Sequence, residues 1–238
     1  MVIVSITSYR QRLPFIRTTL NSIYNQTVKA DKIVLTLYKD DVSFIPSLVQ
    51  KDISEGKLEL IVCDEDIKSH TKYYFVMRKY PNDIIITIDD DLIYPNDMIS
   101  SLLESYKKHP NCISARRVHK IIKGEKYCNW EHECKDILEP SMVLFATGCG
   151  GVLYPPNILE IDLLDKNDIV GCIYADDILL KHIQYKKGIK VVWAKNNQPH
   201  PLKNRICMAI SKPLSDYNVI NNGNDRYIEK YKIYDHEE

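Results

Sequence analysis

The stretch IIITIDDD, residues 84–91, decides the fold that the sequence predicts. Its first five residues are mostly β-branched and show no polar alternation, which is typical of a strand buried on both faces of a parallel sheet. Three carboxylates follow where that strand should end, and ligands of open α/β sheets bind outside this end of the strands. Because side chains alternate along an extended chain, we expect Asp89 and Asp91 to face one way and Asp90 the other.

The three aspartates form a candidate metal site. Crowded carboxylates repel one another and raise each other's pKa unless a cation joins them. A hard divalent ion, Mg²⁺ or Mn²⁺, held by one or two carboxylates and a substrate phosphate, would relieve that repulsion. The alternative is an acidic turn that has no chemical role. Three aspartates directly behind so apolar a strand favour the metal site.

The composition is that of an ordinary globular protein. Of 238 residues 45% are hydrophobic, and 32 basic residues balance 32 acidic ones, so no net charge favours nucleic acid as a partner. Seven cysteines without regular spacing favour a reducing compartment over a disulfide framework. The chain shows neither a signal peptide nor an apolar run of roughly 20 residues that could span a bilayer. We therefore expect a cytoplasmic protein, and peripheral association with the inner face of a membrane is left open.

Strands alternate with helices along the first 116 residues. Apolar runs predict strands at 2–6, 32–37, 58–63, 84–88 and 112–115. Helical spacing predicts helices at 13–24, at 72–79 and from residue 96 or 97 onward, with a helix or turn at 44–49. Such alternation indicates a doubly wound, Rossmann-like α/β fold, with a mixed, mainly parallel sheet flanked by helices.

The pattern is weaker after Arg116. Strands are expected at 142–146, 152–154 and 189–193, and helices near 158–164, at 178–187 and at 225–234. Residues 107–126 hold seven Lys or Arg and one acidic residue, which is compatible with an anionic acceptor or a phospholipid surface, although a solvated loop is favoured. Cys128, His132 and Cys134 suggest zinc, but their spacing is not that of a common finger and a fourth ligand is missing, so zinc is disfavoured.

Two later motifs complete the candidate chemistry. Three glycines among residues 148–151 imply backbone that comes close to a ligand or to another chain segment, and composition does not decide between them. Asp176 and Asp177 open a helix, where aspartate commonly serves as an N-cap. Group transfer from a diphosphate, however, needs a cation on the leaving phosphates and a separate base for the incoming hydroxyl, and a second acidic pair suits that base.

Taken together, these motifs resemble those of the inverting GT-A glycosyltransferases of family two. The resemblance covers roughly residues 1–195, and the order and spacing of its parts make it more specific than any single motif. A bacterial branch of that family looks closest, through residues 71–72, the core at 86–95 and residues 224–225. The matching segments are 7–10, 21–27, 88–91, 148–151 and 176–180.

The resemblance implies a UDP-sugar donor and a divalent metal ion. By the match to the DxD motif, Asp91 would bind the metal, and Asp89 would lie near the ribose and share the metal site. Family members commonly place an acidic residue after the second strand to read the uracil, whereas this chain has LTLY at 35–38, so Asp64 is the substitute candidate. Further donor contacts are expected from Thr7, Tyr9, Arg10, Lys68, Lys72, Gly150 and Gly151, with Asp90 in a structural or secondary role.

The resemblance also implies a mechanism. Asp177 matches the catalytic base, with Asp176 in the position of the preceding glutamate, so that an acceptor hydroxyl displaces UDP directly and with inversion. The expected acceptor is a glycan or lipid-linked glycan of a bacterial surface polysaccharide. One domain, 1–238, is expected to comprise a nucleotide-sugar half (1–116), an acceptor-side half (117–195) and a C-terminal extension (196–238). Trp130 and Trp193 are candidate platforms for a sugar ring, with core packing favoured for Trp193.

Three other functions fit parts of the pattern. A sugar-nucleotide nucleotidyltransferase would need a glycine-rich loop after the first strand, and residues 7–12 contain no glycine. A phosphatase with an aspartate nucleophile would need a small hydroxyl residue soon after Asp91, where Leu92, Ile93 and Tyr94 stand instead. A non-catalytic subunit that binds a nucleotide-sugar or a carbohydrate on the same fold would not need Asp177, unless that residue only caps its helix.

Overall fold

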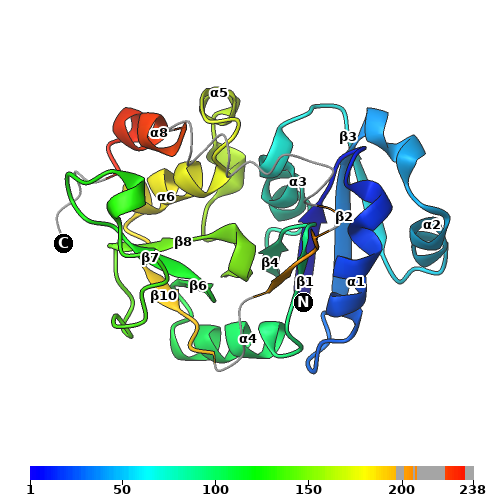
Figure 1. Ribbon diagram of the computed structural model, residues 1–238, viewed down its shortest axis with the longest axis horizontal. Helices are drawn as coiled ribbons and strands as arrows, with labels where there is room; N and C mark the ends of the chain where they lie inside the picture. Colours follow the sequence, from blue (N-terminus) through cyan, green and yellow to red (C-terminus); the bar gives the residue numbers. More distant parts are fainter. Residues whose placement is uncertain (197–200, 206, 208–222, 234–238) are drawn as a thin grey trace.

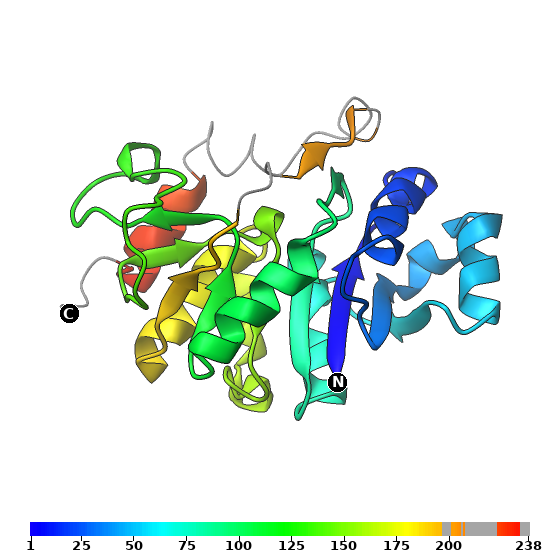
Figure 2. The same ribbon diagram turned by 90° about the horizontal axis from the view of Figure 1, so that it is seen from below.

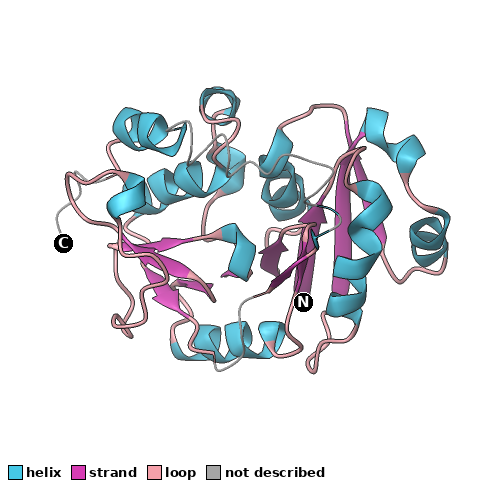
Figure 3. Cartoon of the chain, viewed as in Figure 1, coloured by secondary structure: helices cyan, strands magenta, loops and turns pink. Residues whose placement is uncertain are grey.

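The computed structural model describes residues 1–196, 201–205, 207 and 223–233. At its centre lies a seven-stranded sheet of order β10-β6-β9-β4-β1-β2-β3, in which β9 runs antiparallel to both of its neighbours and the other pairs are parallel (Figures 1 and 3). The predicted mixed, mainly parallel α/β sheet is confirmed. Its strands are β1 (Val2–Thr7), β2 (Lys32–Tyr38), β3 (Glu59–Cys63), β4 (Ile84–Ile88), β6 (Ile113–Ala115), β9 (Val152–Tyr154) and β10 (Val191–Trp193).

Helices cover both faces of the sheet, and two small ladders complete the fold. β5 (Leu92–Ile93) pairs with β11 (Leu202–Lys203), and β7 (Val118–Lys120) pairs with β8 (Leu144–Ala146). The α-helices are α1 (Ile16–Tyr24), α2 (Ser47–Ser54), α3 (Thr71–Lys79), α4 (Met98–Lys108), α5 (Lys166–Gly171), α6 (Asp176–Lys187) and α8 (Gly223–Tyr231). Short 3₁₀ turns are η1 (Leu13–Phe15), η2 (Lys39–Phe44), η3 (Lys68–His70), η4 (Tyr127–Asn129), η5 (Gly148–Gly150) and η6 (Ile161–Leu163).

The central strands supply apolar side chains to two separate cores. Ile86 and Ile88 of β4 pack in one core with residues of α1, α2 and α4. Ile85 belongs to the other core and packs with residues of α3 and α6. This period of two explains why β4 carries an unbroken apolar run, because both of its faces are buried. Figure 2 shows helices on both faces of the sheet. β1 pairs with β4 in the register Ile6 to Ile88, so the two strands end level with each other.

The predicted helix at 158–164 is wrong. Only the 3₁₀ turn η6 forms there, and the helix α5 follows it at Lys166–Gly171. Asn157 and Glu160 both have a positive φ, 51° and 47°, which interrupts a right-handed helix twice within four residues. Leu159 and Ile161 are nevertheless buried, so apolar side chains that enter the core from irregular backbone imitated a helical period.

The C-terminal helix α8 packs against α6 (Figure 1). Ile228 and Tyr231 are buried, and the centroid of the Tyr231 ring lies 4.7 Å from that of the His182 ring on α6. The predicted helix at 225–234 is thus observed two residues earlier, and residue 234 lies outside the described part of the chain. Within the described residues, no helix combines the length and apolarity needed to cross a membrane.

Candidate active site

The acidic cluster lies at the carboxyl end of β4, next to the level end of β1. Asp89, Asp90 and Asp91 directly follow the strand, and their side chains are 30%, 6% and 16% exposed. The two outer carboxylates are therefore open to a ligand and the middle one is not. Asp90 and Asp91 nevertheless lie in a turn and share the guanidinium of Arg12, so the strict alternation expected of an extended chain does not hold here.

Asp90 is held by the protein itself. Its carboxylate accepts hydrogen bonds from Ser8 Oγ at 2.5 Å and from Arg12 Nη1 at 2.9 Å, and its backbone carbonyl accepts one from Thr19 Oγ1 at 2.9 Å. These partners come from the β1–α1 connection and from α1, so Asp90 fixes the end of β4 to the first helix. Arg12, which the sequence analysis did not single out, also lies 3.1 Å from Asp91 Oδ2.

Asp89 and Asp91 fit a divalent cation. Burial raises the pKa of Asp91 to about 6, and the charge of Asp89 adds to this effect despite the nearby Arg12 guanidinium. Burial and the charge of Asp89 thus disfavour the charged form of Asp91 unless a further cation is bound, and carboxylate oxygens are the ligands that Mg²⁺ and Mn²⁺ prefer. Among the described residues, no three His, Cys, Asp or Glu side chains gather closely enough to hold a metal. Substrate phosphate and water would complete the coordination, as is usual for Mg²⁺.

Lys72 joins this cluster to the second acidic pair. Its Nζ lies 2.8 Å from Asp89 Oδ1 and 2.9 Å from Asp176 Oδ2, and the residue is only 4% exposed. Burial alone would lower the pKa of Lys72, but the carboxylates of Asp176 and Asp89 raise it well above its usual value. Lys72 is therefore a buried, charged bridge between the end of β4 and the start of α6.

Asp177 differs from Asp176 in its partners. Its two carboxylate oxygens accept the backbone N–H of Gly148, at 3.2 and 3.1 Å, whereas Asp176 takes the ammonium of Lys72. Burial, followed by the charge of Asp176, raises the pKa of Asp177 to about 7, while the pKa of Asp176 is lowered by Lys72. The hydrogen bonds of Asp177 reach a distant segment and not its own helix, so capping does not account for this residue.

A buried lysine fixes α6, the helix that begins with the two aspartates. Lys181 is 1% exposed, and its Nζ donates hydrogen bonds of 2.7 Å to the carbonyls of Met142 and Leu144. Burial lowers the pKa of Lys181 to about 7. Asp177 and Lys181 are four residues apart on one helix face, so both tie α6 to the segment 142–148.

The glycine turn η5 contributes Gly148 to the site. A Cβ atom on Gly148 would lie 2.9 Å from Lys72 Nζ and 3.2 Å from Asp177 Oδ1. By the same construction a Cβ on Gly150 would meet Arg117, and one on Gly151, whose φ is +90°, would meet Met98. Of the two readings left open for these glycines, close approach of another chain segment therefore accounts for Gly150 and Gly151.

Thr7, Tyr9 and Arg10 lie at the end of β1. The Thr7 hydroxyl donates to the carbonyl of Thr36 at 2.8 Å, and Tyr9 is 38% exposed. The Arg10 guanidinium stacks 4.2 Å above the Phe44 ring of η2, and its backbone N–H donates to Asp41 Oδ1 at 3.2 Å. The turn after β2 thus brings an acidic residue, Asp41, to Arg10.

Asp64 and Lys68 do not join the acidic cluster through any contact among the described residues. Asp64 has a side chain that is 90% exposed and lies 3.6 Å from Lys39 Nζ. Lys68 forms an ion pair with Asp66 at the start of the loop before α3. Asp41 could have been suspected from the sequence, because it follows the second strand by three residues, within reach of the same sheet edge.

Residues 118–134 form an aromatic cluster instead of a metal site. Trp130 is 4% exposed and packs against Tyr127 and Phe145, so the expectation that it stacks on a sugar ring is wrong. His132 stacks on His119 with 4.2 Å between ring centroids, and its Nε2 bonds to the carbonyl of Tyr127. In this part of the described chain no zinc-binding group of three side chains forms. The indole N–H of Trp193 donates to the carbonyl of Arg116.

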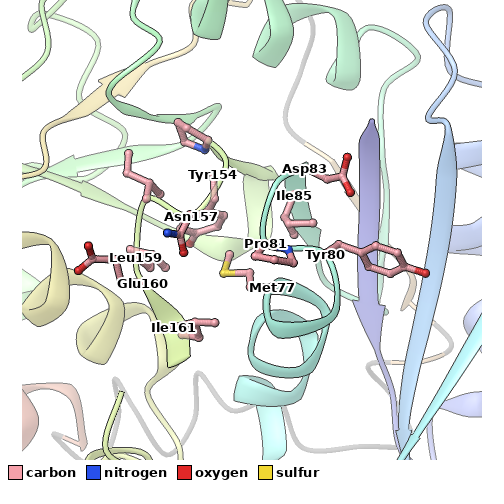
Figure 4. Close-up of a pocket in the computed structure, with 12 residues that line it drawn as sticks. Met77, Tyr80, Pro81, Asp83, Ile85, Tyr154, Asn157, Leu159, Glu160 and Ile161 are labelled. Carbon is pink, nitrogen blue, oxygen red and sulfur yellow. The ribbon is translucent and has the colours of Figure 1, made fainter. Parts of the chain in front are cut away.

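A small pocket lies at the opposite end of β4. Its lining includes Asp83 and Ile85 at the beginning of the strand, together with Met77 and Tyr80 of the α3 region and Tyr154 of β9 (Figure 4). Since β4 runs from this pocket to the acidic cluster, the two features are separated by the length of the strand. Its lining holds none of the candidate site residues.

The sheet order, with an acidic cluster at its carboxyl edge, is that of a Rossmann-like α/β fold of the GT-A type. The family model described as "Glycosyl transferase family 2" matches residues 3–142, which is more than half of the chain. The chain belongs to glycosyl transferase family 2. The match includes the cluster at 89–91 and Lys72 but ends before Gly148 and Asp177. No curated protein matches the chain.

Solved structures share the fold. The mannosyltransferase PcManGT from Pyrobaculum calidifontis, in complex with GDP-Man and Mn²⁺, is 14% identical with a TM-score of 0.58, over 99% of this chain and 65% of that one. TarS 1–349 from S. aureus in complex with UDP is 12% identical with a TM-score of 0.53, over 84% and 59%. The present chain thus spans less than two thirds of either transferase. A 4-diphosphocytidyl-2C-methyl-D-erythritol synthase from Anaerococcus prevotii is 13% identical with a TM-score of 0.52, over 88% and 94%. At these identities the likeness concerns the fold alone.

Proposed function

We propose that this protein transfers a sugar from a UDP-sugar to a hydroxyl of a glycan or lipid-linked glycan, with inversion at the anomeric carbon. The observation that carries the proposal is the pairing of two carboxylate sites through Lys72. One site is open and fits a cation, and the other holds a buried carboxylate whose pKa is about 7. Separate sites for the leaving group and for the base are what direct displacement from a diphosphate requires.

In this proposal Asp177 removes the proton from the acceptor hydroxyl. A base with a pKa near the working pH is the most effective, and general-base help is typically worth about 10²–10⁴ in rate. The N–H of Gly148 fixes the carboxylate, and Lys181 fixes the helix below it. Asp176 keeps Lys72 in place, and the charge of Asp176 raises the pKa of Asp177.

The donor side is proposed to lie over β1 and β4. Asp91 and Asp89 would hold Mn²⁺ or Mg²⁺, which supplies Lewis-acid stabilisation of the diphosphate leaving group. Arg12 and Ser8 hold Asp90 and thereby fix the backbone from which both ligands project. Tyr9 and Arg10 are proposed to contact the uracil and its ribose. Asp41, which accepts the N–H of Arg10, is a nearer acidic candidate for the nucleobase than the exposed Asp64.

The test is release of UDP from a panel of UDP-sugars, with and without Mn²⁺, with products read by mass. Asp91→Ala and Asp177→Ala are expected to lower turnover by at least about a hundredfold. Asp162→Ala, which removes an exposed aspartate paired with Arg78, is the matched control and is expected to retain full activity. Full turnover of both active-site variants would sink the assignment.

Two arms of the same experiment address the alternatives. A nucleotidyltransferase on this fold would release pyrophosphate from UTP and a sugar phosphate, so pyrophosphate is measured in parallel. A non-catalytic subunit would bind UDP-sugars but release no UDP, even to water. The family resemblance alone supports three further parts of the proposal: the identity of the acceptor, a place in surface-polysaccharide synthesis and a peripheral position at the inner membrane. A screen of acceptors tests the identity of the acceptor.

A further inference from the structure

A cationic side chain, that of Arg117, contacts the glycine turn on both sides of Gly148. Arg117 Nη1 donates to Thr147 Oγ1 at 3.2 Å and to Cys149 Sγ at 3.3 Å. Gly148, the residue between these two, donates its N–H to Asp177. The two residues that accept from Arg117, Thr147 and Cys149, are thus the direct neighbours of Gly148, which binds the proposed base Asp177.

Tyr127 is linked to Arg117 through two residues, because its ring packs edge-on against His119, and His119 accepts the N–H of Glu133, the ion-pair partner of Arg117. Burial and the negative charge of Asp177 raise the pKa of the Tyr127 phenol, and the charge of Arg117 opposes this rise. The ring is held in place by Trp130 and Phe145, at 5.1 and 6.1 Å between centroids. Its hydroxyl has no hydrogen-bond partner among the described residues, so it is available to a substrate.

Arg117 also has donors to spare. Its Nε lies 3.1 Å from Glu133, and the side chains of this pair are 23% and 43% exposed. No hydrogen bond from Nη2 to a described residue is found, although a guanidinium carries five N–H donors. The planar fork of arginine matches a carboxylate or phosphate, to which it donates two parallel hydrogen bonds.

We propose that Arg117 and Tyr127 form the acceptor subsite, and that the acceptor sugar carries an anionic group, a phosphate or a carboxylate, which Arg117 binds. This inference rests on the proposed function, because it takes Asp177 as the base that meets the acceptor hydroxyl. The phenol of Tyr127 is then placed to hydrogen-bond a neutral hydroxyl of the same sugar.

The donor diphosphate is the other anion that could meet Arg117. Its proposed place, however, is at the end of β4, where Asp89 and Asp91 fit a cation and Arg12 already supplies positive charge. Arg117 instead lies between β6 and β7 and hydrogen-bonds to the two residues that flank Gly148, the partner of Asp177. In an inverting displacement the base and the leaving group stand on opposite sides of the reacting carbon, so a cation on the base side faces the acceptor.

The experiment is a binding titration with the full chain saturated with UDP and Mn²⁺. Glucose 6-phosphate and glucuronic acid are the anionic probes, and glucose is their neutral counterpart. The wild type is expected to bind both anionic sugars more tightly than glucose. Arg117→Gln is expected to weaken only the anionic probes, by about ten- to hundredfold, as for loss of a hydrogen bond to a charged group.

The controls separate this subsite from other roles of the residues. Arg78→Gln removes an arginine with a comparable exposed ion pair, to Asp162 at 2.9 Å, and is expected to change nothing. Tyr127→Phe keeps the ring packing and is expected to weaken all three sugars several-fold. Arg117→Lys keeps the charge without the fork, and is expected to bind the anionic probes with intermediate strength if Arg117→Gln does not fold.

Three results would overturn the inference. Equal binding of charged and neutral sugars by the wild type would remove the anionic acceptor, and so would absence of binding by both anionic probes. A loss of UDP affinity in Arg117→Gln would assign the arginine to the donor diphosphate. Failure of the proposed function is distinct, since it would appear as absence of UDP release from every UDP-sugar by the wild type, whatever the sugar probes bind.

Discussion

Among single residues, Asp177 is expected to set the pH dependence of turnover. A base acts in its deprotonated form, and burial and the charge of Asp176 raise the pKa of Asp177 to about 7. The rate at limiting substrate should therefore fall about tenfold per pH unit below pH 7 and level off above it. Initial rates from pH 5 to 9 measure this, and a fall that begins only near pH 4, as for an ordinary aspartate, would contradict it.

A variant tests the cause of that shift. Asp176→Asn removes the charge that raises the pKa of Asp177, so the acidic limb of the profile should move to lower pH. An unchanged limb would mean that the charge of Asp176 does not set the pKa of Asp177, which leaves burial and the charge of Asp89.

Gly148 is expected to tolerate no side chain. A Cβ there would lie 2.9 Å from Lys72 Nζ, and that ammonium is held between two carboxylates and has no room to retreat. Gly148→Ala should therefore lower turnover by about ten- to hundredfold through displacement of the base. Gly171→Ala is the matched control, because its Cβ would also meet a lysine Nζ, at 2.4 Å, but Lys230 is exposed and can move. Equal loss in both variants would argue against a role for the turn.

How far the sequence predicted the site depends on which contacts are local. The run at 89–91 could be placed at a strand end, because alternation and apolar patterning act over neighbouring residues. The division of labour between Asp176 and Asp177 could not be predicted, since it depends on Lys72 and Gly148, which reach the pair from distant segments. Arg12 was missed for the same reason, because its two carboxylate partners lie in the turn after β4, the first of them 78 residues further along the chain.

Among the elements, α6 is expected to make stability depend on pH through Lys181. The folded-state pKa of this lysine is about 7 and the unfolded value is near 10.5, so between these values the unfolded chain binds one more proton. The free energy of unfolding should therefore rise with pH, by up to about 1.4 kcal/mol per pH unit from this residue. A neutral amine has two N–H donors, which suits the two carbonyls it meets.

Denaturant unfolding at pH 7 and pH 9 measures this contribution. The rise in stability seen for the wild type should be smaller in Lys181→Met, which has no proton to release. Lys186→Met, at an exposed position of the same helix, is the control and should follow the wild type. If the free energy of unfolding changes between pH 7 and pH 9 by the same amount in the wild type and in Lys181→Met, Lys181 does not contribute to the pH dependence.

Helices and strands were predictable where the hydrophobic periodicity and the residues that end an element agreed. The helix at 178–187 ends at Gly188, whose φ of +64° is the left-handed C-terminal conformation that glycine favours. The prediction of a helix at 158–164 failed because the apolar residues Leu159 and Ile161 are buried although the backbone there is not α-helical. Asn157 and Glu160 have positive φ values, which a right-handed helix does not allow. β7 was missed because a strand of three residues within a basic segment carries too little pattern to recognise.

For the whole molecule, the C-terminal helix α8 is expected to stabilise the part of the chain at residues 117–195. Ile228 is 3% exposed against the core that includes α6, and Asp225 accepts the backbone N–H of Tyr127 at 2.7 Å. Ile228→Ala should lower the free energy of unfolding by about 2–5 kcal/mol, as for other buried isoleucines. A single cooperative transition by two probes is expected, and a separate early transition for α8 would contradict this view.

The antiparallel strand β9 constrains how substrates enter and products leave. β9 joins the two halves of the sheet, since it hydrogen-bonds to β4 on one side and to β6 on the other. To separate the two halves, the backbone hydrogen bonds of β9 would have to break. We therefore expect no hinge opening between the two halves of the sheet. Substrate entry and product release would then depend on movement of the loops at the strand ends. If product release limits turnover, the motion of those loops sets kcat.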